Sequence, residues 1–169
     1  PVNGRFTPEQ RAVYEIVLDA QLAAIAKVRP GNHWNDPHMA AVEVITRGLV
    51  DLGLLKGRWK TLVKEEAYRP YYMHRTGHWL GMDVQDCGAY TEPSEIGNAN
   101  VRRDALTGKD IISRPARILR AGMVLTIEPG IYLPEWGGVR IEDNYLITPG
   151  GAQVLSTLPS DFDSVTLKW

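Results

Sequence analysis

The sequence lacks several features that would assign it to a particular class of protein. Its 169 residues include one cysteine, Cys87, so no intramolecular disulfide can form, which agrees with a reducing compartment. No stretch approaches the roughly 20 continuous apolar residues that a membrane helix needs. The N-terminal residues also lack the charged-then-apolar layout of a signal peptide. We therefore expect a soluble, cytoplasmic protein that does not enter a membrane.

Neither sign of charge dominates the sequence. Nineteen lysines and arginines stand against 20 aspartates and glutamates, which gives a formal net charge of −1. This balance argues against nucleic acid or an anionic membrane surface as the main partner. We find no glycine-rich phosphate loop and no Ser-His-Asp order. The apolar content of 44% is sufficient for a normal core, so we expect one globular domain with a small or uncharged partner.

Two helices are predicted in the first third of the chain. Residues 7–10 (TPEQ) have the pattern of a capping box with proline at the first helical position, and an apolar stripe continues to Val28, before Arg29-Pro30-Gly31. A second helix is predicted from Asp36-Pro37, as cap and first helical residue, to about Gly53. Its buried face is predicted to consist of Met39, Val42, Ile45, Leu49 and Leu52.

The second half of the chain has the composition of strands and turns. A short helix is predicted at 59–67, before this change at Pro70. Residues 123–128 and 139–148 are rich in β-branched and aromatic residues between glycine and proline, which predicts strands. Residues 91–118 are polar without a clear apolar period, and a long surface loop is predicted there. Helices followed by antiparallel strands indicate an α+β domain.

Three segments carry metal-binding residue types in apolar surroundings. His74 and His78 lie four residues apart in HRTGHWLGMD, where the glycines favour strand-and-turn geometry. Glu128 ends the apolar run VLTI, although ionised groups are rarely buried unless they are paired or bind a metal. In GGVRIED, the strand period of two places Arg140 and Glu142 on one face.

Each of these segments, taken singly, also fits an ordinary structural role. The histidines would then be bonded to backbone carbonyls, and the GGVRIED segment would be a surface strand. Together, an imidazole and two carboxylates arriving from three strand ends favour a site for manganese, cobalt or zinc.

The segments HRTGHWLGMDVQD, VLTIEPGIY and GGVRIEDNYLIT resemble the C-terminal half of the catalytic domain of aminopeptidase P and prolidase, which are proline-specific pita-bread metallopeptidases. The segments PVNGRFTPEQRAVYEIVLDA and RPGNHWNDPHMAAVEVITRGLVDLGLLKG resemble helices of that family, so the resemblance covers nearly the whole chain. It implies the pita-bread fold, with residues 1–169 as the C-terminal portion of a single catalytic domain that here lacks its N-terminal strands.

The resemblance also implies a centre of two divalent metal ions held by two aspartates, one histidine and two glutamates. By motif match, His78 is the histidine ligand, Glu128 is a carboxylate ligand and Glu142 is the carboxylate that bridges both metals. Manganese is the ion we expect first, with cobalt or zinc as alternatives.

The implied activity is hydrolysis of the bond between an N-terminal residue and a following proline by metal-activated water. His74 and Arg140 would stabilise the tetrahedral charge, Glu128 would accept the water proton, and Tyr132 would help to form the pocket for proline. The expected partner is a small peptide with proline at its second position. A homo-oligomer is left open, as is the choice between aminopeptidase P and prolidase.

The sequence departs from the family pattern at two places. The two aspartate ligands have no counterpart here, so we expect a fragment that needs upstream polypeptide or an N-terminal companion; Asp83 and Asp86 are assigned structural roles. Gln85 stands where the family usually has a second histidine, and it can bind substrate by hydrogen bonds but cannot titrate. The alternative function is therefore a catalytically silent pita-bread module that binds a peptide or protein.

The remaining candidate residues are assigned structural roles. Cys87 is expected to be a small buried side chain, and His33 and His38 are expected to be exposed or capping. Trp79 and Trp136 lie close enough in sequence to the motifs to line a pocket.

Overall fold

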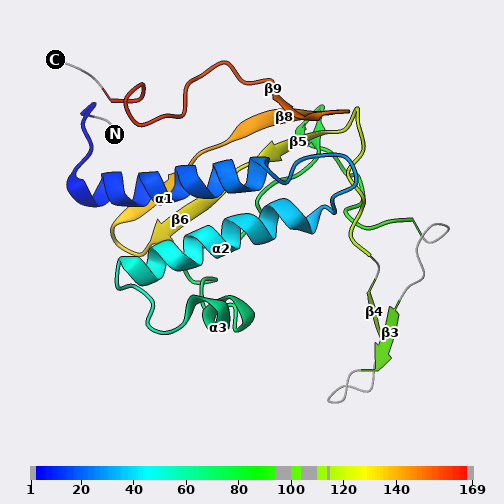
Figure 1. The fold of residues 1–169 in the computed structure, drawn as a ribbon, viewed down its shortest axis with the longest axis horizontal. Helices are drawn as coiled ribbons and strands as arrows, with labels where there is room; N and C mark the ends of the chain where they lie inside the picture. The colour runs from blue at the N-terminus through cyan, green and yellow to red at the C-terminus, as the bar shows by residue number, and fades with distance from the viewer. Residues whose placement is uncertain (1–2, 94–99, 104–109, 114, 167–169) are drawn as a thin grey trace.

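The computed structural model describes residues 3–93, 100–103, 110–113 and 115–166. Within these ranges, two long helices lie side by side across one face of an antiparallel sheet (Figure 1). The helices are α1 (Pro8–Ile25), α2 (Asn35–Asp51) and the short α3 (Trp59–Lys64). The strands are β1 (Leu80–Gly81), β2 (Val84–Gln85), β3 (Asn100–Arg103), β4 (Asp110–Ser113), β5 (Val124–Ile127), β6 (Gly130–Leu133), β7 (Gly137–Arg140), β8 (Asp143–Thr148) and β9 (Gly151–Val154).

All strand pairs in the described residues are antiparallel. The largest described sheet has the order β5-β8-β9, and the two-stranded sheets are β1-β2, β3-β4 and β6-β7. In the central ladder Leu125 lies opposite Tyr145 and Ile127 opposite Asp143, while β6 and β7 pair Gly130 with Arg140. Helices followed by antiparallel strands confirm the predicted α+β class. None of the helices in the described part of the chain is long and apolar enough to cross a membrane.

The two long helices begin in different ways. At α1 the predicted capping box is present, since Thr7 Oγ1 accepts a hydrogen bond from Gln10 N (3.2 Å) and Gln10 Oε1 accepts one from Thr7 N (2.9 Å). At α2 the prediction of Asp36 as cap is wrong, because the helix begins at Asn35, two residues earlier than predicted, and its N-cap is Trp34. Asp36 instead lies in the first turn, where its carboxylate accepts a hydrogen bond from His33 N (2.8 Å).

The prediction for the buried face of α2 is confirmed at the centre of the helix and is wrong at its ends. Val42, Ile45 and Leu49 are fully buried, whereas Met39 and Leu52 are exposed. His38 and Ala41, with Pro37 and Thr46, continue the buried stripe, and Met39 lies about 100° around the helix from His38 because an α-helix has 3.6 residues per turn. The short helix predicted at 59–67 is confirmed as α3.

The strand predicted at 139–148 is two strands. β7 pairs with β6 and β8 pairs with β5, so the chain changes partner at Ile141 and Glu142. The predicted alternation survives the break, since Arg140 and Glu142 are exposed while Ile141 and Asp143 are buried. Glu142 therefore lies outside both ladders.

The long loop predicted at 91–118 is wrong in part. β3 and β4 form a ladder that pairs Val101 with Ile112, and these β-branched residues favour strands. Residues 94–99, 104–109 and 114 of that prediction lie outside the described residues.

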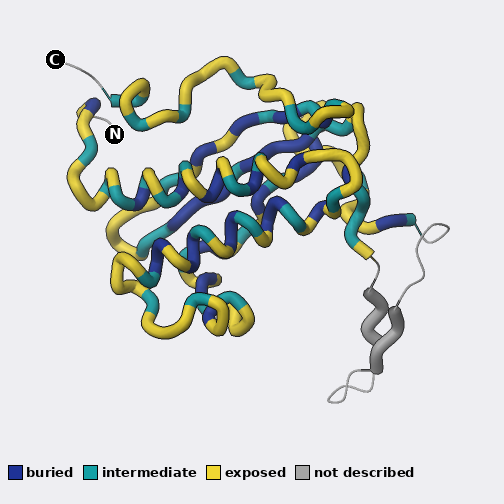
Figure 2. The backbone as a smooth tube through the Cα atoms, in the orientation of Figure 1, coloured by how far each residue is buried: buried dark blue, intermediate teal, exposed yellow. Residues whose placement is uncertain are grey.

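The core lies between the two long helices and the strands beneath them. Figure 2 shows buried residues along the sides of α1 and α2 that face each other and the sheet. The fully or almost fully buried apolar residues include Val17, Ala20, Ala24, Val42, Ile45, Leu49, Leu125, Ile127, Ile131 and Ile147. This packing holds the ends of strands β5 and β8 in place. The polar residues of the candidate site lie directly next to these strand ends.

Candidate metal centre

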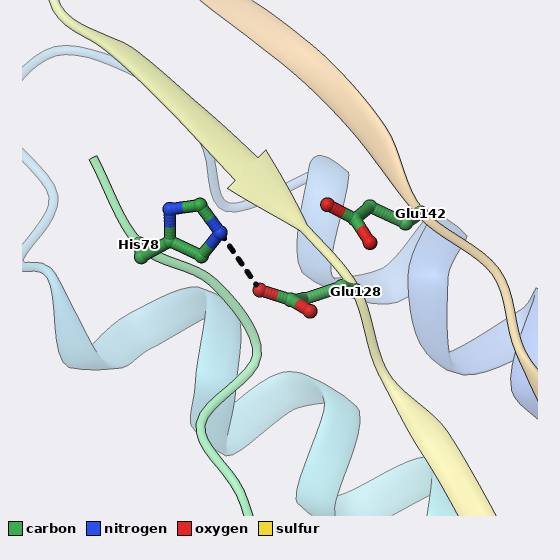
Figure 3. A group of neighbouring side chains, drawn as sticks. All are labelled: His78, Glu128 and Glu142. Carbon is green, nitrogen blue, oxygen red and sulfur yellow. Dashed lines mark ion pairs between the residues drawn. The ribbon is translucent and has the colours of Figure 1, made fainter. Parts of the chain in front are cut away.

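Three of the predicted site residues meet at one place. His78 precedes β1, Glu128 directly follows β5, and Glu142 lies between β7 and β8. Each offers one ligand atom, and these atoms lie within 4.8 Å of one another. His78 Nε2 is 3.4 Å from Glu128 Oε1, and Figure 3 shows the three side chains directed toward a common space. A histidine nitrogen and two carboxylates are a donor set that suits a borderline or hard divalent ion.

Hydrogen bonds orient His78 and Glu128 toward this space. His78 Nδ1 lies 2.9 Å from Trp79 O, so in the neutral tautomer that donates this hydrogen bond the Nε2 lone pair is free. His78 N donates to Thr126 Oγ1 (3.0 Å), and that hydroxyl donates to Glu128 Oε1 (3.2 Å). Thr126, in the interior of β5, thus connects the backbone of His78 to the side chain of Glu128.

Gly77 allows the segment before His78 to pass against β5. A Cβ at position 77 would lie 2.0 Å from Thr126 O, much closer than any real contact. The close approach lets Thr126 N donate to His78 O (2.9 Å) and Glu128 N donate to Thr76 O (2.6 Å). A backbone contact of this kind explains why the motif has glycine next to its histidine.

Gln21 of α1 is a residue that the sequence analysis missed. It is buried, and its amide nitrogen lies 3.4 Å from Ile127 O, 3.3 Å from Ile141 O and 3.1 Å from Asp143 Oδ2. The two carbonyls belong to the residues just before Glu128 and Glu142, so one side chain connects the backbones that carry both carboxylates. The sequence signal was a glutamine next to Ala20 on the apolar stripe of α1.

His74, Tyr132 and Arg140 form a second hydrogen-bonded group beside the carboxylates. His74 Nε2 is 2.8 Å from Tyr132 Oη, and Arg140 Nη1 donates to the same oxygen at 3.5 Å. Arg140 Nε lies 4.0 Å from Glu128 Oε2 and 3.8 Å from Glu142 Oε2. The hydrogen bond that Arg140 donates to Tyr132, with the charges of Glu142 and Glu128, raises the pKa of Arg140, so its guanidinium stays cationic.

These groups border a cleft of about 550 Å³. Its lining includes the predicted site residues His74, His78, Gln85, Glu128 and Arg140, and Glu142 and Tyr132 are in contact with lining residues without being part of the lining. Two aromatic residues that we did not predict, Trp34 and Tyr90, also line the cleft, and their rings stack with centroids 4.7 Å apart.

Several structural roles predicted from the sequence need correction. Cys87 is exposed rather than buried. His33 is exposed as expected, but His38 is 7% exposed and lies inside the protein. Trp79 is buried and Trp136 is exposed, and neither lines the cleft; each borders a different hollow. The exposed Asp83 and Asp86 do not belong to the group of metal-binding side chains.

Fold and site together define a metalloenzyme-type centre in an α+β domain. The model of metallopeptidase family M24 matches residues 2–149, and the chain belongs to this family. The Xaa-Pro aminopeptidase of Haemophilus influenzae is 42% identical to it in an alignment 165 positions long, which covers 92% of this chain and 34% of that protein. The chain therefore spans about a third of the length of this curated relative.

Solved structures of aminopeptidase P share the fold. Proline aminopeptidase P II from Yersinia pestis is 39% identical, with a TM-score of 0.80 over 98% of this chain and 36% of that chain. The zinc-substituted aminopeptidase P of Escherichia coli in complex with product is 36% identical, with a TM-score of 0.73 over 92% of this chain and 32% of that chain. The predicted pita-bread fold is confirmed, and a centre for divalent metal is supported.

Proposed function

We propose that residues 1–169 are the C-terminal portion of the catalytic domain of a peptidase that cleaves between an N-terminal residue and a following proline. The convergence of His78, Glu128 and Glu142 at the edge of one cleft is the observation that carries this proposal. The Xaa-Pro aminopeptidase from Haemophilus influenzae supports the substrate class. Both an aminopeptidase and a dipeptidase with this preference fit the site.

The residues present fit the metal centre that the family implies. We propose that His78, Glu128 and Glu142 would hold a pair of divalent ions, with two aspartates from polypeptide outside these residues as the remaining ligands. Manganese suits this oxygen-rich set, and cobalt or zinc would also be accepted. Such a pair of ions, when bound, supplies a water whose pKa is lowered to near neutrality.

The protein groups around the carboxylates have separate roles in this proposal. Thr126 holds Glu128 Oε1, so Glu128 Oε2 is the atom that accepts the proton of the nucleophilic water. Arg140 and His74 stabilise the negative charge of the tetrahedral carbonyl oxygen, and Tyr132 connects them by hydrogen bonds. Trp34 and Tyr90 offer an apolar wall to the peptide, and Gln85 offers an amide that can bind its carbonyl oxygen.

The proposal is tested by Glu142→Ala in the complete enzyme that carries these residues. We expect bound metal and hydrolysis of an Xaa-Pro peptide to be lost together, with turnover reduced at least about 1,000-fold. Glu43→Ala is the matched control, because Glu43 is an exposed carboxylate on α2, away from the site, and pairs only weakly with Arg47 (3.6 Å). Normal turnover by the Glu142 variant would refute the assignment.

Gln85 supports one alternative, a pita-bread module that binds peptide without cleaving it. Gln85 lines the cleft and cannot take up or release a proton, unlike the histidine usual at this position. A folded protein with metal content near zero that still binds an Xaa-Pro peptide would favour this alternative. Metal analysis and calorimetry on the wild-type protein separate the two functions.

A further inference from the structure

Behind the cleft lies a buried group of three hydrogen-bonded side chains, which we call the support cluster: His38 of α2, Tyr72 and Thr76. They are 7%, 1% and 2% exposed, respectively. Thr76 Oγ1 lies at the centre, 2.8 Å from His38 Nδ1 and 2.5 Å from Tyr72 Oη. Burial, with the nearby Arg75 charge, lowers the pKa of His38 to about 3, so this imidazole is neutral at ordinary pH.

The support cluster is directly connected to the candidate metal centre. Thr76 lies between His74 and His78, and its carbonyl accepts a short hydrogen bond from Glu128 N (2.6 Å). The ring of Tyr72 packs edge-on against His74, with centroids 5.1 Å apart, and also packs against His38 at 5.7 Å. Two segments of the site, the one that carries His74 and the one that carries Glu128, are therefore in contact with this one cluster.

The hydroxyl of Thr76 explains why these positions are polar. A hydroxyl can donate one hydrogen bond and accept others, so it can satisfy a neutral imidazole and a phenol at the same time. No described buried side-chain nitrogen or oxygen lacks a partner. Removal of the hydroxyl would leave two buried polar groups without their partner, and the segment could relax only by moving.

We propose that His38, Tyr72 and Thr76 are positioning residues, which hold the His74–His78 segment against Glu128 so that the metal ligands have the required geometry. The cluster touches neither the cleft nor the reacting atoms, so it acts only through His74, His78 and Glu128. This inference rests on the proposed function, because the consequence of the positioning is metal affinity.

The experiment compares Thr76→Val with Thr76→Ser in the complete protein. Valine matches the shape of threonine without the hydroxyl, whereas serine keeps the hydroxyl. Mn²⁺ binding is measured by calorimetry, and the exchange of the Glu128 amide by mass spectrometry of a peptide spanning β5 and Glu128. For Thr76→Val we expect the Kd for Mn²⁺ to rise about 10- to 100-fold, as for other groups that orient metal ligands. Exchange at Glu128 should become faster, and Thr76→Ser should differ from wild type by less than about threefold in both measurements.

Tyr72→Phe is a milder variant that keeps the ring and removes one hydrogen bond, so it tests the cluster even if Thr76→Val does not fold. We expect it to weaken Mn²⁺ binding by a smaller factor than Thr76→Val. If both variants bind Mn²⁺ as tightly as wild type, the positioning role is overturned, even if exchange at Glu128 becomes faster. If the wild-type protein itself binds no Mn²⁺, the proposed function fails instead.

Discussion

The polar groups on the two sides of the His74–His78 segment differ in their hydrogen-bond and ion-pair partners. On the cleft side, Arg140 and Glu142 are exposed, and the carboxylates of Glu128 and Glu142 lie close together with Arg140 beside both, while Glu128 also accepts a hydrogen bond from Thr126. On the inner side, His38 and Tyr72 are buried and both are hydrogen-bonded to one hydroxyl. The carboxylates of the first group can still accept a ligand, whereas the Thr76 hydroxyl of the second group is already bonded to two side chains.

This difference shows how one extended segment serves two purposes. His74 and His78 line the cleft, while Thr76 between them is buried, so this segment does not follow the alternation of a strand, which would place residues 74, 76 and 78 on one face. Substitutions of residues on the cleft side should therefore change activity more than stability. Substitutions of residues on the inner side should change stability. Four predictions test this division, in order of expected effect.

Glu128→Gln should have the largest effect of the four predictions, and it should lower activity without lowering stability. It removes a proposed ligand and proton acceptor, so hydrolysis by the complete enzyme should fall at least about 1,000-fold, or about 4 kcal/mol in the barrier. The metal-free protein should unfold at the same or a slightly higher temperature, because two nearby carboxylates no longer repel each other. Glu15→Gln on the exposed face of α1 is the control. Retained hydrolysis, or a large drop in Tm, would contradict the division.

Gly77→Ala should destabilise the protein, because position 77 is where the segment touches β5. The added Cβ would meet Thr126 O, a backbone atom that cannot turn away. We expect a loss of about 3 kcal/mol in the free energy of unfolding, measured with urea. Gly150→Ala is the matched control, since a Cβ there meets nothing within 4 Å, and it should change stability by less than about 0.5 kcal/mol. Equal stabilities of the two variants would refute the close approach.

His38 should make stability depend on pH. Its folded-state pKa of about 3 lies below the ordinary 6.5, with burial first and then the charges of Arg75, His74 and Arg69 as causes. Below pH 6.5 the His38 imidazole therefore binds a proton in the unfolded chain but not in the folded protein. The free energy of unfolding thus decreases as the pH falls from 6.5 toward 3. From pH 7 to pH 5 this costs the wild type about 2 kcal/mol. The free energy of unfolding of His38→Asn, measured with urea, should not show this loss. A pH profile parallel to that of the wild type would contradict the prediction.

Three residues that the sequence singled out as metal ligands lie close together in the structure, whereas several details of the fold differ from the prediction. His78, Glu128 and Glu142 could be found because carboxylates and imidazoles at the ends of apolar strands have few structural explanations. The capping box at Thr7 is likewise a local pattern with one meaning. Their meeting within 4.8 Å, across 50 and 14 residues, required the family resemblance and was not visible in local patterns.

What the sequence did not predict depends on tertiary contacts. The break between β7 and β8 follows from a change of pairing partner, which the alternation of Arg140, Ile141 and Glu142 does not reveal. His38 and Gln21 are polar residues on apolar helix faces, and their burial depends on partners far away in sequence, Thr76 and the carbonyl of Ile141. A polar residue that interrupts a buried stripe is thus a signal for a buried network, but it does not identify the partner.

Tyr132→Phe should have the smallest effect of the four predictions. It distinguishes the role of Tyr132 from that of the other tyrosine in contact with His74. The Tyr132 hydroxyl contacts His74 Nε2 and Arg140 at the cleft, so its loss should lower kcat for an Xaa-Pro peptide about tenfold, or about 1.4 kcal/mol. Stability should change by less than about 0.5 kcal/mol, because the hydroxyl is near solvent. Tyr71→Phe, which removes an exposed hydroxyl bonded to Leu54 O, is the control and should leave kcat unchanged. If Tyr132→Phe lowered Tm and left kcat intact, the cleft group would belong with the support cluster, and the division between chemistry and structure along residues 74–78 would be wrong.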